Sequence, residues 1–170
     1  MNVWLRTAKD LADSLANVVK LIEEWDSSAI ILKGIRRSLQ LDRYSCGVQS
    51  VRIILAYFGR SVSVDSIERK LETDEEGTSI TAIRQLLKSR GLTTTIRVDA
   101  TLRDIKRAIY SGCPVLVSFS HDEHWAVVYG YSKKAIYIAD SSITKNLRCR
   151  VSKARFLRQW DGWMMAVRPN

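Results

Sequence analysis

Apolar residues near the start of the chain recur at alternating steps of four and three. The stripe consists of Trp4, Ala8, Leu11, Leu15, Val18, Ile22 and Trp25. This heptad spacing predicts an amphipathic helix, which ends at the polar break from Asp26 to Ser28. Three heptads are short for a coiled coil, so we favour packing of this helix on the rest of the molecule over pairing with another chain. We assign residues 1–33 to an N-terminal amphipathic helix extension and residues 34–170 to the main domain.

Four further helices are predicted before and around the middle of the chain. Each has apolar residues at helical spacing and a neighbouring residue that commonly caps a helix. Gly59 and Gly91 are the expected terminators, and Ser63 and Thr101 are expected N-caps. The predicted helices run from Gly47 to Phe58, Val64 to Leu71, Ser79 to Arg90 and Leu102 to Tyr110.

The period of the pattern changes in the second half, where β-branched and aromatic residues predominate. The predicted strands are Thr93 to Val98, Val115 to Ser120, Trp125 to Tyr131, Ala135 to Asp140 and a closing strand from Trp163 to Val167. A short helix is expected from Ser152 to Trp160. A helical half followed by an antiparallel sheet predicts an α+β domain.

Composition limits the class of protein. With 170 residues and 46% hydrophobic content, the chain can form one compact domain with a core. Its longest apolar runs, such as Ile53 to Phe58, are far shorter than the roughly 18 residues that a membrane span needs. No secretory signal precedes the first helix. We therefore expect a cytoplasmic protein with no transmembrane segment.

The net charge of +9 is unevenly distributed. Basic residues crowd the last third of the chain, and an acidic stretch runs from Asp65 to Glu76. Solvated surfaces are the favoured interpretation, and an acidic peptide partner is the next. No nucleic-acid reader motif accompanies the charge, so no nucleic-acid partner is expected.

The cysteines are three in number and far apart, which argues against a disulfide framework or a zinc site. We interpret Cys113 and Cys149 as structural. Cys46, in contrast, immediately precedes the predicted helix from Gly47. A thiol acts as a nucleophile only as its anion, and the N-terminus of a helix stabilises that anion.

A base for such a nucleophile must come from His121 or His124, the only histidines. His124 and Asp140 lie sixteen residues apart on two predicted strands, with position 132 midway between them. A three-residue loop at Ser132 to Lys134 would place the two residues opposite each other, so that Asp140 orients the imidazole. His121 would point to the other side of the strand, which argues against a metal site formed by both histidines.

Gln40 lies six residues before Cys46 and could donate hydrogen bonds to an oxyanion, together with the backbone N–H of Cys46. Taken singly, each of these residues is usually structural. Together, Cys46, His124, Asp140 and Gln40 predict a cysteine peptidase.

These residues resemble the bacteriocin-processing peptidases of cysteine peptidase family thirty-nine, which form the cytoplasmic N-terminal domains of ABC exporters. The resemblance covers about Leu39 to Val167 and includes the Cys46-Gly47 pair, GTSITAIRQLLKSRGL, CPVLVSF and HWAVVYGY. It implies a papain-like fold and cleavage after a double glycine in the leader of a secreted peptide. Cys46 and His124 would perform the hydrolysis without a cofactor, Asp140 would orient the ring and Gln40 would form the oxyanion hole. Trp125 would be a candidate wall of a narrow cleft, unless it packs in the core.

The sequence departs from that family at Ser45, where an Asp is common, and at Ser141, where a Pro is common. Neither change removes a catalytic atom. No transporter segment follows Asn170, so we expect a free-standing peptidase domain whose partner exporter is encoded separately.

Two alternatives remain open at this point. The first is a non-catalytic peptidase-like module that binds a substrate or a transporter partner, and the second is an acyltransferase or isopeptide hydrolase with the same thiol chemistry. Motifs for nucleotide, dinucleotide or structural zinc binding are absent from the sequence. We therefore expect neither a cofactor nor a metal.

Overall fold

A computed structural model describes residues 29–36, 38–39, 44–74, 77–119, 124–142 and 150–170. The predicted helix from Trp4 to Trp25 lies outside these residues, as do Gln40, His121 and Cys149. In the described part of the chain, no helix is both long and apolar enough to span a bilayer.

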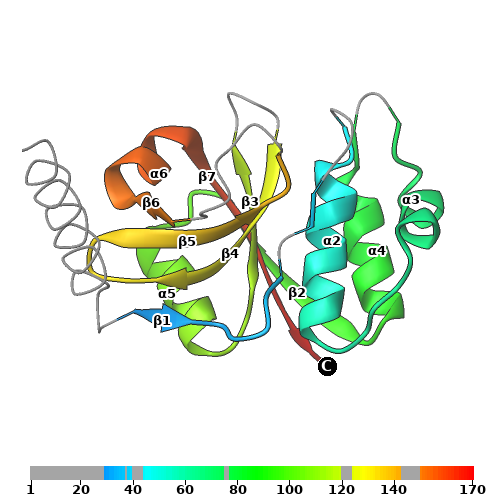
Figure 1. Ribbon diagram of the computed structural model, residues 1–170, viewed down its shortest axis with the longest axis horizontal. Coiled ribbons are helices and arrows are strands. Elements are labelled where there is room, and N and C mark those ends of the chain that lie inside the picture. Colours follow the sequence, from blue (N-terminus) through cyan, green and yellow to red (C-terminus); the bar gives the residue numbers. More distant parts are fainter. Residues whose placement is uncertain (1–28, 37, 40–43, 75–76, 120–123, 143–149) are drawn as a thin grey trace, which may run out of the picture.

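The centre of the molecule is an antiparallel sheet of seven strands, counted over the described residues (Figure 1). Its main path runs in the order β2-β7-β3-β4-β5-β6, and β1 pairs with the end of β4. The strands are β1 (Ile30–Ile31), β2 (Leu92–Arg97), β3 (Val115–Phe119), β4 (His124–Tyr131), β5 (Ala135–Asp140), β6 (Arg150–Ser152) and β7 (Trp160–Pro169).

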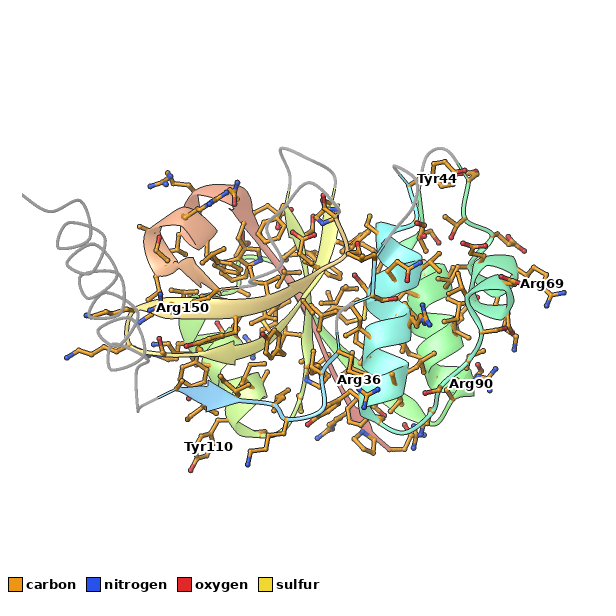
Figure 2. All side chains as sticks on the ribbon, viewed as in Figure 1. Arg36, Tyr44, Arg69, Arg90, Tyr110 and Arg150 are labelled. Carbon is orange, nitrogen blue, oxygen red and sulfur yellow. The ribbon has the colours of Figure 1, made fainter. Side chains whose placement is uncertain are left out.

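Helices cover both faces of this sheet (Figure 1). One face packs against α2 (Cys46–Tyr57), α3 (Val64–Leu71) and α4 (Ile80–Ser89), and the other against α5 (Leu102–Tyr110) and α6 (Lys153–Gln159). Because side chains alternate along a strand, Leu116 belongs to the first core, whereas Val115 and Val117 belong to the second. The side chains in Figure 2 fill the space between the layers.

The predicted α+β arrangement is confirmed, and several helix boundaries follow from local caps. Ser63 accepts a hydrogen bond from the backbone N–H of Ser66 at the start of α3. Thr101 and Asp104 form a capping box at the start of α5. Such bonds satisfy backbone donors that a helix start leaves free, which explains why α3 and α5 have the predicted bounds.

The structure contains two short strands that were not predicted from the sequence. β1 consists of Ile30 and Ile31, which pair with Tyr131 and Gly130. These two residues fall within the predicted extension 1–33, yet they join the sheet. β6 has three residues and pairs with β5. Strands this short depend on a partner strand and have too few residues to show a period of two.

The predicted register of the hairpin between β4 and β5 is wrong by two residues. Lys133 and Lys134 form a two-residue turn, since the N–H of Ser132 donates to the carbonyl of Ala135. An irregularity between Val128 and Gly130 then shifts the register. Asp140 consequently pairs with Ala126 and not with His124. It still lies on the same side of the hairpin as His124, because positions two apart along a strand point the same way.

Candidate active site

Cys46 is the first residue of α2, which begins one position before the predicted start at Gly47. The start of this helix is enclosed: every residue from Cys46 to Val51 is buried, and Cys46 is only 4% exposed. The apolar residues of α2, among them Val48, Val51 and Ile54, are buried in the core on the side of the sheet that also holds α3 and α4. The first backbone N–H groups of α2 have no partner within the helix, and they make the position of Cys46 favourable for an anion.

His124 begins β4 and Asp140 ends β5, so both lie at the same end of the sheet. Nε2 of His124 is 2.7 Å from Oδ1 of Asp140. The same oxygen accepts a hydrogen bond of 2.9 Å from the backbone N–H of Ser142. His124 is 8% exposed, which shields this pair from water. The hydrogen bonds to His124 and to the backbone of Ser142 hold the carboxylate of Asp140 in place, and this carboxylate orients the ring of His124.

Cys46 and His124 interact directly. Burial by itself lowers the pKa of His124. Hydrogen bonds to Asp140 and Cys46, together with the negative charges of both groups, outweigh burial and raise that pKa to about 9. Since Nε2 is bonded to Asp140, Nδ1 is the ring nitrogen left for Cys46. With this pKa the ring is protonated at neutral pH and can hold a proton between the sulfur and the carboxylate.

Gln40, the fourth predicted site residue, lies outside the described residues. The described chain just before it is anchored to α2. Ser38 donates a hydrogen bond of 2.6 Å to Oε1 of Gln49, and Arg52 donates one of 2.9 Å to Ser38. Gln49 is buried and lies three residues after Cys46, one turn along α2. Its sequence signal is a polar residue within an apolar helix pattern, and this signal alone does not distinguish a positioning residue from a surface residue.

Trp125, a candidate wall of a substrate cleft, is partly buried against the core beside α2. Its ring meets Trp163 edge to face, with centroids 5.0 Å apart. The β7 segment that carries Trp163 is held by Asp161, which accepts hydrogen bonds from the backbone N–H of Trp163 and from the hydroxyl of Ser118. Core packing is therefore part of the role of Trp125.

Cys113 is remote from this chemistry. It is a free thiol between Gly112 and Pro114, and burial raises its pKa. Its sulfur contacts the carbonyl of Ser111. Within the described residues, no group of three or more His, Cys, Asp and Glu side chains is placed to bind a metal ion.

A buried thiol at a helix start, an imidazole and a carboxylate, arranged in that order on an α+β fold, define the class of papain-like cysteine peptidases. Residues 35–170 match the Peptidase C39 family. The chain belongs to this family and is a cysteine peptidase by class.

Similar proteins of known role are transporters. One is the lactococcin transport/processing ATP-binding protein LcnC-like of Lactococcus lactis subsp. lactis, 28% identical over 131 residues. Another is the transport/processing ATP-binding protein ComA of Streptococcus pneumoniae, 25% identical over 132 residues. These alignments cover 76% and 77% of this chain but only 18% of each relative. The chain thus spans less than a fifth of the length of these relatives.

Solved structures show the same fold. The peptidase domain of Streptococcus ComA, a bi-functional ABC transporter, has a TM-score of 0.67 at 22% identity, covering 80% of this chain and 99% of that one. A double glycine motif protease from an AMS/PCAT transporter, crystallised with the leader peptide, has a TM-score of 0.69 at 18% identity, covering 82% and 94%. The predicted papain-like fold is therefore confirmed.

Proposed function

We propose that Cys46, His124 and Asp140 form the catalytic triad of a peptidase that cleaves leader peptides after a double glycine. The observation that supports this most strongly is the 2.7 Å contact between Nε2 of His124 and Asp140, on a ring that also interacts with Cys46. The non-catalytic alternative gives no reason for this arrangement, because a binding module needs neither a thiolate nor an oriented imidazole.

The triad would act by nucleophilic catalysis. The sulfur of Cys46 attacks the carbonyl carbon as a thiolate, and the proton it has lost resides on His124. When the tetrahedral intermediate collapses, the C–N bond breaks and protonated His124 donates that proton to the leaving amine. A thioester with Cys46 remains. Neutral His124 then removes a proton from water, which attacks the thioester and releases the acid.

The intermediate carries a negative charge on the former carbonyl oxygen. The backbone N–H of Cys46, at the start of α2, is one candidate donor to this oxyanion. We assign the second donor to the side-chain amide of Gln40. The hydrogen bond between Ser38 and Gln49 supports this assignment, because Ser38 lies two residues before Gln40, and Gln49 lies one turn along α2 from the nucleophile.

The substrate assignment rests on the family. The similar structures include a double glycine motif protease with its leader peptide, and the similar proteins are transport/processing proteins for lactococcin and related peptides. A Gly-Gly sequence presents no side chain, so a narrow site can accept it and exclude bulkier residues. We assign to this chain the leader of a secreted peptide such as a bacteriocin precursor.

The partner and the compartment follow from the same assignment. An ABC exporter would receive the processed peptide, whether it is encoded separately or belongs to the same polypeptide. The reaction would take place in the cytoplasm, where precursors are made and where thiols such as Cys46 stay reduced.

Incubation with leader-like peptides tests the proposal. The protein should cut a peptide that contains Gly-Gly on the carboxyl side of the second glycine, as read by mass spectrometry of both products. Cys46→Ala should leave the peptide intact, and replacement of either glycine by leucine should abolish cleavage. A protein that binds the Gly-Gly peptide without cutting it would be a binding module, and the proposed function would be wrong.

A further inference from the structure

A row of residues crosses four strands of the sheet near the turn that joins β4 to β5. Ile31 on β1 lies opposite Gly130 on β4, which in turn lies opposite Tyr137 on β5. Tyr137 lies opposite Arg150 on β6. Residues directly opposite each other in antiparallel strands direct their side chains to the same face of the sheet. Ile31, Tyr137 and Arg150 therefore project from one face, and we call them the Tyr137 row.

The neighbouring row shows which face this is. It consists of Ile30, Tyr131, Ile136 and Val151, which lie opposite one another in the same way. All four belong to the second core or pack against it, on the side of α5 and α6. Because side chains alternate along a strand, the Tyr137 row points to the other face, the one that also carries α2.

Tyr137 is more buried than the described helices of that face explain. It is only 5% exposed, and its ring meets the ring of Tyr129 edge to face, with centroids 6.3 Å apart. Among the described residues, neither Tyr137 nor Ile31 belongs to the first core or packs against it, where α2, α3 and α4 cover the sheet. One neighbouring ring covers only part of another, so the burial of Tyr137 points to a further segment over this end of the face.

The chain that leads into β1 arrives beside this row. β1 starts at Ile30, and the apolar stripe of the predicted N-terminal helix ends at Trp25. The backbone steps between Trp25 and Ile30 span at most about 18 Å when extended. Two strand spacings, or about 10 Å, separate β1 from β5. The segment before β1 is thus long enough to bring the stripe over the Tyr137 row.

The charge of this segment also suits the rest of the chain. Residues 1–28 contain three cationic and five acidic residues, a net charge of −2, whereas residues 29–170 contain 24 and 13, a net charge of +11. Within the Tyr137 row, Arg150 is exposed on β6 (Figure 2). Opposite net charges favour association of the two parts of the chain.

We infer that the amphipathic helix from Trp4 to Trp25 docks with its apolar stripe on the Tyr137 row of its own chain. A helix is about 10 Å across, so it spans roughly the two strand spacings from β1 to β5. Gly130 adds no side chain between Ile31 and Tyr137, and a Cβ atom there would lie only 3.1 Å from Cγ1 of Ile31. The absence of this side chain lets a helix approach the sheet closely.

A segment of the same chain is favoured over a second copy or another partner. The short linker from residue 26 to residue 29 holds the stripe near the row, which gives an effective concentration of roughly millimolar. A separate molecule would lose translational and rotational freedom on binding to the same surface. Docking within the chain also removes the apolar stripe from water.

Cysteine labelling in the full chain tests this inference. Ile31→Cys places a thiol in the Tyr137 row, and Val151→Cys places one in the neighbouring row on the opposite face. Leu11→Asp combined with Leu15→Asp interrupts the apolar stripe. This pair should let iodoacetamide label the thiol at position 31 at least about tenfold faster, because the covering helix is released. The rate at position 151 should stay the same. Tryptic peptide mass spectrometry separates both thiols from the three native cysteines.

Ala16→Asp combined with Asn17→Asp is the matched control, since it adds the same charge to the predicted helix away from the stripe. This pair should leave the rate at position 31 unchanged. The protection at position 31 should also persist on about hundredfold dilution, because the helix is tethered. Equal rates at position 31 with and without the stripe substitutions would overturn the inference. So would loss of protection on dilution, which would indicate a second copy, or equal acceleration at position 151, which would mean that the stripe supports the domain as a whole.

Discussion

Thr78 occupies the space that a side chain at Gly47 would need. A Cβ atom at position 47 would lie 2.8 Å from both Cβ and Oγ1 of Thr78. Thr78 is itself held by a 2.8 Å hydrogen bond to the hydroxyl of Thr73. This contact places the loop before α4 directly against the first turn of α2, next to Cys46, so the glycine after the nucleophile fixes how closely the two elements approach.

Gly47→Ala should therefore destabilise the protein and disturb the nucleophile. Overpacking of this kind costs about 1–3 kcal/mol, and relief of the clash would move either the loop or the first turn of α2. Urea denaturation should show the loss of stability, and peptide cleavage should fall with it. Gly47→Ala combined with Thr78→Gly removes the clashing atoms and should recover part of the activity. A Gly47→Ala protein as stable and active as the parent would contradict this packing argument.

Substitutions at Asp140 separate orientation from charge. Asp140→Asn keeps an oxygen that can accept from Nε2 of His124, so cleavage should fall less than it does in Asp140→Ala. Asp140→Ala removes the acceptor, and cleavage should fall by about a thousandfold because the ring is no longer held towards Cys46. Both variants should lower the pKa of His124, since Asp140→Asn removes the negative charge, and Asp140→Ala removes both that charge and the hydrogen bond that raises the pKa most. Kinetics across a pH series would measure both effects.

If Asp140→Ala cleaved peptides as well as Asp140→Asn does, Asp140 would have no orienting role. The control is Asp161→Ala. That carboxylate accepts hydrogen bonds from the hydroxyl of Ser118 and the backbone N–H of Trp163 at the start of β7, so its loss should affect stability more than catalysis.

The stability of the protein should depend on pH through His124. Its pKa of about 9 in the folded protein is above the ordinary value of 6.5, so the folded state binds the proton more tightly than the unfolded state does. This contribution is fully present below about pH 6.5 and is lost as the pH rises through about 9. The free energy of unfolding of the parent, measured in urea, should fall over that range.

Cys113 and Tyr57 also have raised pKa values and would add to the loss of stability at alkaline pH. The comparison with His124→Gln isolates the histidine, because both cysteine and tyrosine contributions remain in that variant. The difference in unfolding free energy between parent and variant should shrink from pH 6.5 to 9. A constant difference would mean that the charged ring is not stabilised in the fold.

Gln49 should act as a positioning residue for the segment that leads to Gln40. Gln49→Leu removes the acceptor of the Ser38 bond and should lower kcat by about tenfold with little change in KM, because the oxyanion contact forms only in the transition state. Gln49→Glu retains an acceptor next to Ser38 and Arg52 and should restore most of kcat. A loss confined to KM, or no rescue by Gln49→Glu, would contradict this role.

The sequence was sufficient for those features that depend on local signals. The start of α2 at Cys46, the bounds of α3 and α5, and the strand from Ala135 to Asp140 depend on caps, apolar spacing and turn residues that lie within a few positions of one another. The proximity of His124 and Asp140 followed from their even separation and the short hairpin between them. These contacts are local along the chain or across a single turn.

What the sequence could not show depends on longer-range packing. The two-residue turn at Lys133 and Lys134, together with the irregularity after Val128, shifts Asp140 to a position opposite Ala126. A bulge leaves no distinct pattern in side chains that are buried on both faces. The Gly47 and Thr78 contact joins residues 31 positions apart, and only the assembled layers reveal it.

Labelling of the cysteines with iodoacetamide at about pH 5.5 tests the central claim most directly. If His124 holds the proton that Cys46 has lost, Cys46 should be alkylated at least about tenfold faster than Cys113, whose thiol stays protonated under these conditions. His124→Ala should abolish the difference, and tryptic peptide mass spectrometry would assign each site. Slow labelling of Cys46 at that pH, equal to that of Cys113 and unaffected by His124→Ala, would show that no thiolate and imidazolium pair exists.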